Sequence, residues 1–159
     1  MKIALLAAAI FAADRTSKNL VEKKLSAYDK VEVIKNAVYI TKLRNRGAPY
    51  GLLSDRPKTL AALTAVSVAL FSLEAAKRAK EYGSSGAFKF SIACIIGGGA
   101  GNIYSRIKKG YVTDFLQIKS SPAFNVADIS ILAGMCAFMG DILIRRKITK
   151  SACLVTSHY

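Results

Sequence analysis

The chain has 159 residues, of which 52% are hydrophobic, and a formal net charge of +14; a chain of this length is expected to form a single domain. The basic excess would suit a nucleic-acid-binding protein, but a mean hydropathy of +0.29 favours a membrane protein whose lysines and arginines lie between apolar spans. The only histidine, His158, cannot build a histidine-based zinc site or a serine–histidine pair, and the three widely spaced cysteines predict no disulfide framework.

The first apolar segment covers residues 3–21. Its basic start and small residues are also typical of a cleaved secretory signal. We favour an uncleaved first membrane helix, because the pattern continues past Asp14 and places Asp14 and Lys18, four residues apart, on one helix face.

Residues 22–58 are too polar and charged to lie in hydrocarbon. Within them, residues 31–43 are rich in β-branched and aromatic side chains, which predicts short strands at a membrane surface. The following segment, residues 46–51, contains two glycines and a proline and predicts a turn.

Three more apolar stretches follow, at residues 60–76, 88–104 and 126–144. The second of these is rich in glycine, which lets helix backbones approach closely in lipid. Between the last two, residues 111–116 alternate as a strand does. We therefore predict one domain, residues 1–159, with a membrane all-α core of four transmembrane helices and a small extracytoplasmic β-rich surface element.

Basic residues follow the stretches at residues 60–76 and 126–144: they are Lys77, Arg78, Lys80 and Arg145 to Lys147. With four spans these clusters share one side with Lys2. The positive-inside rule makes that side cytoplasmic. We expect a multi-pass protein of the bacterial cytoplasmic membrane with both termini cytoplasmic.

Ionisable residues inside membrane spans are costly and are candidates for function. Asp141 precedes Arg145 by one helical turn, which predicts an ion pair. Asp128 begins the fourth span, where the helix dipole alone could explain an acid. A functional interpretation is equally open, because Asp114 in the preceding loop would lie in the same outer layer. Three further polar side chains are expected in that layer: Asn102, Arg106 and Asn125.

Two adjacent carboxylates that share a proton titrate as a coupled pair, with one ionised and one neutral. The ionised member can accept a proton from water, and the neutral member can hydrogen-bond to a scissile carbonyl. This chemistry predicts an aspartic peptidase that needs no metal and no cofactor.

Five segments together resemble the lipoprotein signal peptidases (signal peptidase II). They are Asp14-Arg15-Thr16-Ser17-Lys18, residues 44–51 with Asn45 and Gly47, residues 97–102 with Asn102 followed by Arg106, Tyr111-Val112-Thr113-Asp114-Phe115, and Phe124-Asn125-Val126-Ala127-Asp128. The resemblance covers nearly the whole chain. It implies removal of signal peptides from diacylglyceryl-modified prolipoproteins, by a cut before the lipidated cysteine near the outer membrane face.

The resemblance also implies roles for individual residues. Asp114 and Asp128 would be the catalytic pair. The residues expected to bind substrate or shape the site are Asp14, Lys18, Asn45, Gly47, Asn102, Arg106 and Asn125. For Lys18 an alternative is a lysine that reaches out to the membrane interface. The expected partners are prolipoprotein substrates and membrane lipids, with no nucleic acid, and the enzyme is expected to be a monomer.

One position departs from the family pattern. Ser105 precedes Arg106, where the family usually has aspartate. An inactive family member that still binds precursors is therefore one alternative. A membrane binding or transport protein with a path through Asp14, Lys18 and Asp128 is a second, and a soluble basic nucleic-acid binder is a third.

Overall fold

The computed structural model describes residues 2–27, 29–47 and 56–156. Four helices and three strands follow the chain in the order α1 (Ile3–Lys24), β1 (Lys30–Ile34), β2 (Val38–Asn45), α2 (Pro57–Tyr82), α3 (Gly86–Lys109), β3 (Val112–Ile118) and α4 (Val126–Thr156). Most of the predicted turn at residues 46–51 lies outside the described residues.

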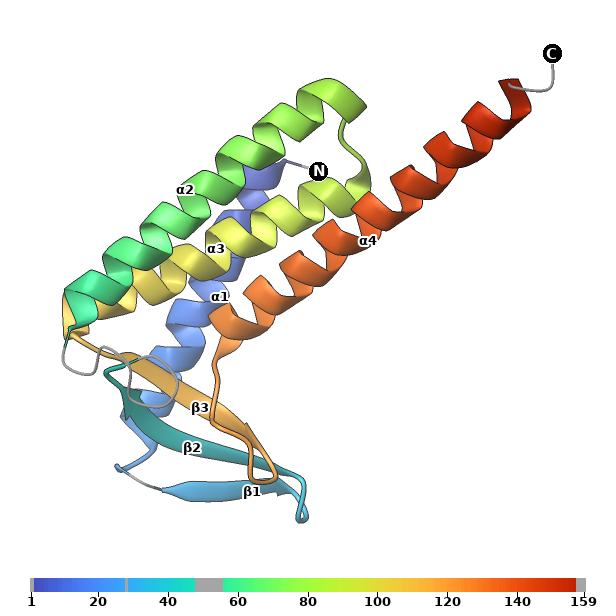
Figure 1. Ribbon diagram of the computed structural model, residues 1–159. Helices are drawn as coiled ribbons and strands as arrows, with labels where there is room; N and C mark the ends of the chain where they lie inside the picture. The colour runs from blue at the N-terminus through green and yellow to red at the C-terminus, as the bar shows by residue number, and fades with distance from the viewer. Residues whose placement is uncertain (1, 28, 48–55, 157–159) are drawn as a thin grey trace.

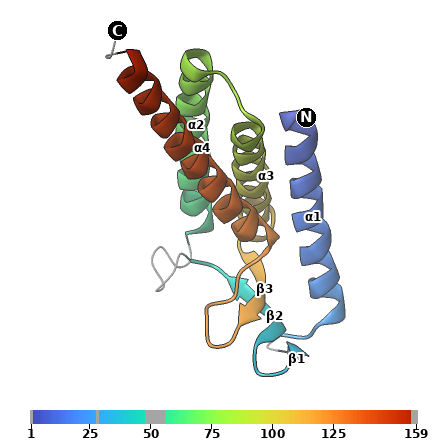
Figure 2. The same cartoon turned by 90° about the vertical axis from the view of Figure 1, so that its right-hand side faces the viewer.

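The helices form a bundle around α3, which packs against α1, α2 and α4 (Figures 1 and 2). The sheet lies at one end of the bundle. The beginning of α1, the α2–α3 connection and the far end of α4 lie at the opposite end. A polar layer therefore caps an apolar bundle, as predicted from the order of apolar and polar segments.

Glycines in α3 explain how closely the neighbouring helices approach it. A Cβ atom on Gly98 would lie 2.6 Å from the carbonyl oxygen of Ala127 in α4, and one on Gly97 would lie 2.6 Å from that of Ala7 in α1. Real Cβ atoms do not come this close to backbone oxygen, so any side chain at either position would force the helices apart. Close backbone approach through small residues is a common way to pack helices in lipid.

The helices are longer than the apolar stretches predicted. α2 begins at Pro57, whose missing N–H costs nothing at the first helical position, and it ends before Gly83. α3 ends at Lys109 and is followed by Gly110 in the left-handed conformation. The predicted bounds covered only the apolar residues, whereas the helical hydrogen bonds continue into charged turns at the ends of the helices. Within the described residues, two helical segments are long and apolar enough to cross a membrane: Pro57–Tyr82 and Val126–Arg145.

The sheet is antiparallel in the order β1-β2-β3. β2 and β3 pair with Leu43 opposite Asp114 and Asn45 opposite Val112. On its other side β3 bonds to Phe124, whose N–H and carbonyl pair with Leu116. The strands predicted within residues 31–43 and 111–116 are thus confirmed, and β3 is held between β2 and the segment that leads into α4.

Candidate active site

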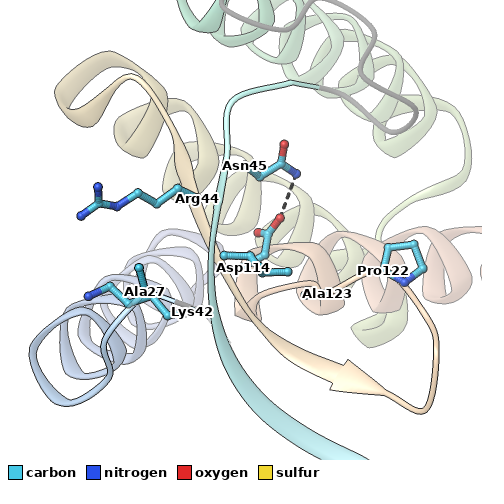
Figure 3. Close-up of a pocket in the computed structure, with 8 residues that line it drawn as sticks. Ala27, Lys42, Arg44, Asn45, Asp114, Pro122 and Ala123 are labelled. Carbon is cyan, nitrogen blue, oxygen red and sulfur yellow. Dashed lines mark hydrogen bonds between the residues drawn. The ribbon is translucent and has the colours of Figure 1, made fainter. Parts of the chain in front are cut away.

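Asp114 lies in the middle of β3, with 4% of its surface exposed. Its carboxylate accepts one hydrogen bond on each oxygen. Asn45 Nδ2 donates to Oδ2 at 2.8 Å, and Asn125 Nδ2 donates to Oδ1 at 2.6 Å. The first of these contacts crosses from β2, as Figure 3 shows. A buried carboxylate is therefore held by two neutral amides from two different elements.

Asp128 lies in the first turn of α4 and takes part in a reciprocal cap. The backbone N–H of Asn125 donates to Asp128 Oδ2 at 3.1 Å, and the backbone N–H of Asp128 donates to Asn125 Oδ1 at 3.1 Å. This is the capping-box arrangement, with asparagine and aspartate in place of the usual residues. Asn102 of α3 donates to the other carboxylate oxygen, Oδ1, at 2.8 Å.

Asn125 connects the two aspartates directly. Its side-chain amide nitrogen bonds to Asp114, while its side-chain oxygen and backbone N–H both bond to Asp128. It is completely buried. The dipole and functional interpretations of Asp128 are therefore compatible, since one residue caps the helix and links the pair.

The electrostatics of Asp114 let its carboxyl group keep a proton to a higher pH than an ordinary aspartate does. The pKa of Asp114 is raised to about 6, chiefly by burial and in smaller part by the negative charge of Asp128, against the opposing effects of the hydrogen bonds from Asn45 and Asn125 and of the charge of Lys18. The influence of Asp128 on this pKa places the two carboxyl groups within electrostatic reach of each other.

A second layer of polar groups lies behind Asp128. Lys18 Nζ donates to Asp14 Oδ2 at 2.7 Å and to Asn102 Oδ1 at 2.9 Å, and only 1% of Lys18 is exposed. The alternative in which Lys18 reaches the membrane interface is therefore wrong. Asp14 in turn accepts the backbone N–H of Ala127 at 3.0 Å, so α1 supports the first turn of α4.

Gly101 leaves room for this layer. A Cβ atom at that position would collide with the carboxylate of Asp14. Only glycine lets α3 pass this close to the Asp14 side chain, which explains part of the glycine-rich segment predicted to matter for packing.

A pocket of about 460 Å³ opens beside Asp114 (Figure 3). Its lining combines the segment after α1, strand β2, Asp114 of β3 and the segment before α4: Ala27, Lys42, Leu43, Arg44, Asn45, Asp114, Pro122 and Ala123. Buried Gly47 donates its backbone N–H to Asn45 Oδ1 at 3.1 Å, which orients the amide whose nitrogen faces Asp114. Arg106 lies in electrostatic reach of both aspartates.

Ser105 does not take the place of a site carboxylate. It is buried, and its hydroxyl donates to the carbonyl oxygen of Gly101, one turn earlier in α3, at 2.9 Å. This bond stays within the helix. The aspartate that the family usually has at this position is thus replaced by a serine whose hydroxyl hydrogen-bonds to the backbone of its own helix.

Glu22 and Thr113, which join α1 to β3 beside the site, were not among the predicted site residues. Neither lies in an apolar span, where a buried polar group would have indicated a function. The ion pair predicted between Asp141 and Arg145 is confirmed at 2.8 Å. In the part of the chain that the structure describes, no cluster of three or more histidine, cysteine, aspartate or glutamate side chains is arranged to hold a metal ion.

Comparison with known proteins agrees with this geometry. The family described as signal peptidase (SPase) II matches residues 6–144. The lipoprotein signal peptidase of Solibacter usitatus is 35% identical over 152 residues, covering 87% of this chain and 88% of the relative. That of Sulfurihydrogenibium sp. is 36% identical over 150 residues, covering 88% and 91%.

Solved structures show the same fold. A bacterial membrane enzyme determined by the in meso method at 2.3 Å resolution superposes with a TM-score of 0.77 at 24% identity, over 89% of this chain and 87% of the other. A second such enzyme, at 1.9 Å resolution, gives 0.73 at 23% identity over 89% and 92%. The match to the family over residues 6–144 and the curated relatives lead to one conclusion: this chain belongs to the signal peptidase II family of aspartic-type peptidases.

Proposed function

We propose that this chain is an aspartic endopeptidase that removes signal peptides from diacylglyceryl-modified prolipoproteins, cutting before the lipidated cysteine. The family assignment and the names of the relatives support the substrate class. The observation that carries the chemistry is the link through Asn125, which hydrogen-bonds to Asp114 and to Asp128 at once.

The two aspartates take different roles. Asp114 is the neutral partner, because burial raises its pKa to about 6 and substrate binding would remove more water from it. Asp128 is the ionised partner, because it lies at the N-terminus of α4 and accepts bonds from Asn102 and from a backbone N–H.

Peptide cleavage then follows from these protonation states. Asp128 accepts a proton from a water molecule as the water oxygen attacks the scissile carbonyl carbon. Asp114 donates its proton to the carbonyl oxygen, which stabilises the charge that develops there. Collapse of the tetrahedral intermediate breaks the C–N bond: the proton held by Asp128 passes to the leaving nitrogen, and a hydroxyl proton of the intermediate returns to Asp114, which leaves a carboxylic acid and restores the starting protonation states.

The remaining residues hold this pair in position. Asn45 and Asn102 each donate to one carboxylate, and Gly47 orients Asn45. Asp14 and Lys18 support Asn102 and the start of α4 from α1. Arg106 would bind substrate, since its charge lies within electrostatic reach of both carboxylates.

We further propose that residues 1–159 form one domain in the bacterial cytoplasmic membrane and that all four helices span it. Both ends of the chain would be cytoplasmic and the sheet would lie at the outer face. Figure 1 supports this, because the sheet, to which Asp114 belongs, and the beginning of α4, to which Asp128 belongs, lie at one end of the bundle, opposite the beginning of α1. A monomer would be sufficient, since every residue of the proposed site comes from one chain.

The test uses purified protein with a diacylglyceryl-modified prolipoprotein and measures release of the signal peptide. The unaltered chain should cleave, and Asp114→Asn and Asp128→Asn should each lower kcat by about 10³-fold or more, because an amide cannot share the proton. Circular dichroism should show both variants folded. Cleavage that persists in both variants at the rate of the unaltered chain would refute the proposed pair.

Ser105 motivates the one competing proposal, an inactive member that only binds precursors. The variant Ser105→Asp separates the two. We expect the unaltered chain to be active and the variant to change the rate modestly. Activity that arises only in the variant would identify the natural chain as a non-enzyme.

A further inference from the structure

Glu22, in the last turn of α1, connects three elements of the fold. Lys109, at the end of α3, donates to Glu22 Oε2 at 2.5 Å. The hydroxyl of Thr113, in β3, donates to Glu22 Oε1. In addition, Lys42 of β2 donates to the backbone carbonyl of Glu22 at 2.9 Å and to that of Leu25 at 2.7 Å.

Thr113 immediately precedes Asp114 in β3, and its exposed fraction is 1%. Successive side chains of a strand point to opposite faces of the sheet. Thr113 therefore faces α1 while Asp114 faces the pocket and the two asparagines. Glu22 holds the strand from behind, at the residue next to the proposed catalytic acid.

The hydrogen bonds on the other face require this support. Asp114 meets Asn45 at 2.8 Å and Asn125 at 2.6 Å, through amides from two separate elements. A shift of β3 by about 1 Å would break both bonds and move the carboxyl group relative to Asp128, and misplacement on that scale can cost about 10²-fold in rate.

We propose that Glu22 is a positioning residue for the peptidase reaction, acting through Thr113 to hold Asp114 against its partners. The inference rests on the proposed function. The bonds described for the Glu22 carboxylate go to Lys109 and Thr113, whereas Lys42, which lines the pocket, bonds to the backbone carbonyl of Glu22. The effect of the Glu22 side chain on catalysis therefore passes through the strand. Lys109 contributes by holding the Glu22 side chain in place.

The experiment measures kcat and KM for the prolipoprotein at a temperature where every variant is folded. Glu22→Ala should lower kcat about 10- to 100-fold and leave KM within about 3-fold, because the substrate contacts remain while the acid is displaced. Thr113→Val should behave in the same way. The conservative variants Glu22→Gln and Thr113→Ser should recover most of the rate, since an amide oxygen or a serine hydroxyl can still form the bond.

The double variant Glu22→Ala with Thr113→Val should lose no more than the worse single variant, because both remove one interaction. Glu32→Ala is the matched control. Its carboxylate accepts the backbone N–H of Asn36 in the β1–β2 turn, away from the site, so kcat should stay within about twofold.

Three results would overturn the inference while leaving the proposed function intact. They are an active Glu22→Ala enzyme with unchanged kcat, a lowered melting temperature with unchanged kcat, and effects of the two single variants that multiply in the double variant. An unaltered chain that fails to cleave would instead refute the proposed function and the positioning role with it.

Discussion

The two ends of the helix bundle each hold buried acidic side chains, but the groups that hydrogen-bond to these side chains differ in charge. At the end away from the sheet, called the inner end after its proposed orientation, Asp141 is 6% exposed and accepts bonds from Arg145 Nε at 2.8 Å and from Ser85 Oγ at 2.5 Å. At the sheet end, called the outer end, the described bonds to Asp114 and Asp128 come from asparagine side chains and one backbone N–H.

The difference separates a structural acid from a reactive pair. Asp141 pairs with the full charge of Arg145 and accepts a bond from Ser85, so its carboxylate ties α4 to the α2–α3 connection. Neutral amides orient a carboxylate without supplying a compensating full charge. The lysine at the outer end, Lys18, hydrogen-bonds to Asp14 and Asn102 and not to either aspartate of the proposed catalytic pair, so no bond from this lysine fixes the proton of Asp114 or Asp128.

The largest expected effect tests whether Lys18 balances Asp14. Lys18→Met would leave the carboxylate of Asp14 buried without its cation, which should destabilise the protein by about 3 to 5 kcal/mol. Thermal unfolding in detergent measures this loss. The double variant Lys18→Met with Asp14→Asn should recover much of it, and the exposed control Lys23→Met should change little. A stable Lys18→Met protein would show that the outer end does not depend on this ion pair.

The next effect tests the link through Asn125. Serine caps helices well but cannot reach Asp114, so Asn125→Ser should lower kcat about 10- to 100-fold with little change in melting temperature. Asn125→Ala should show the same loss of rate and in addition a destabilisation of about 1 kcal/mol from the lost cap. Equal rates for the serine variant and the unaltered chain would assign Asn125 to helix capping alone.

The pH dependence sharpens the contrast between the two kinds of acid. Because neutral Asp114 is the active form and its pKa is raised to about 6, kcat/KM should fall as the pH rises through this value, by about tenfold per pH unit above it. Asn45 donates to the ionised form and so opposes the shift. Asn45→Ala should therefore move the fall of kcat/KM to higher pH, whatever its effect on the maximal rate.

Rate profiles from pH 5 to 9 on both proteins decide this prediction. If the fall of kcat/KM moved to lower pH in Asn45→Ala, the assignment of Asp114 as the proton-holding partner would be contradicted. If kcat/KM did not fall at high pH in either protein, the requirement for a neutral acid would be contradicted.

The smallest effect is expected at the inner end. Asp141→Asn removes one charge of a pair whose arginine is 24% exposed, so it should cost about 1 kcal/mol of stability and leave kcat within about twofold. The melting temperature and the cleavage rate measure the two quantities. A tenfold loss of turnover would mean that the two ends are coupled and that the contrast between them is incomplete.

Much of the fold follows from local pattern. Apolar runs long enough for helices, the alternating residues of β3 and the glycine-rich part of α3 are properties of neighbouring residues, and they predicted these elements and their order. The spacing of Asp141 and Arg145 likewise predicted their ion pair, because residues four apart on a helix share a face.

Tertiary structure alone decided how distant groups meet. The amide of Asn125 binds Asp114, Asp14 supports the first turn of α4, and Glu22 binds Thr113, all contacts between residues far apart along the chain or on separate elements. Local propensity carries no information about which of several polar groups share a buried layer. That is settled by helix packing through Gly98 and Gly101, whose missing side chains bring α1, α3 and α4 close enough for these bonds to form.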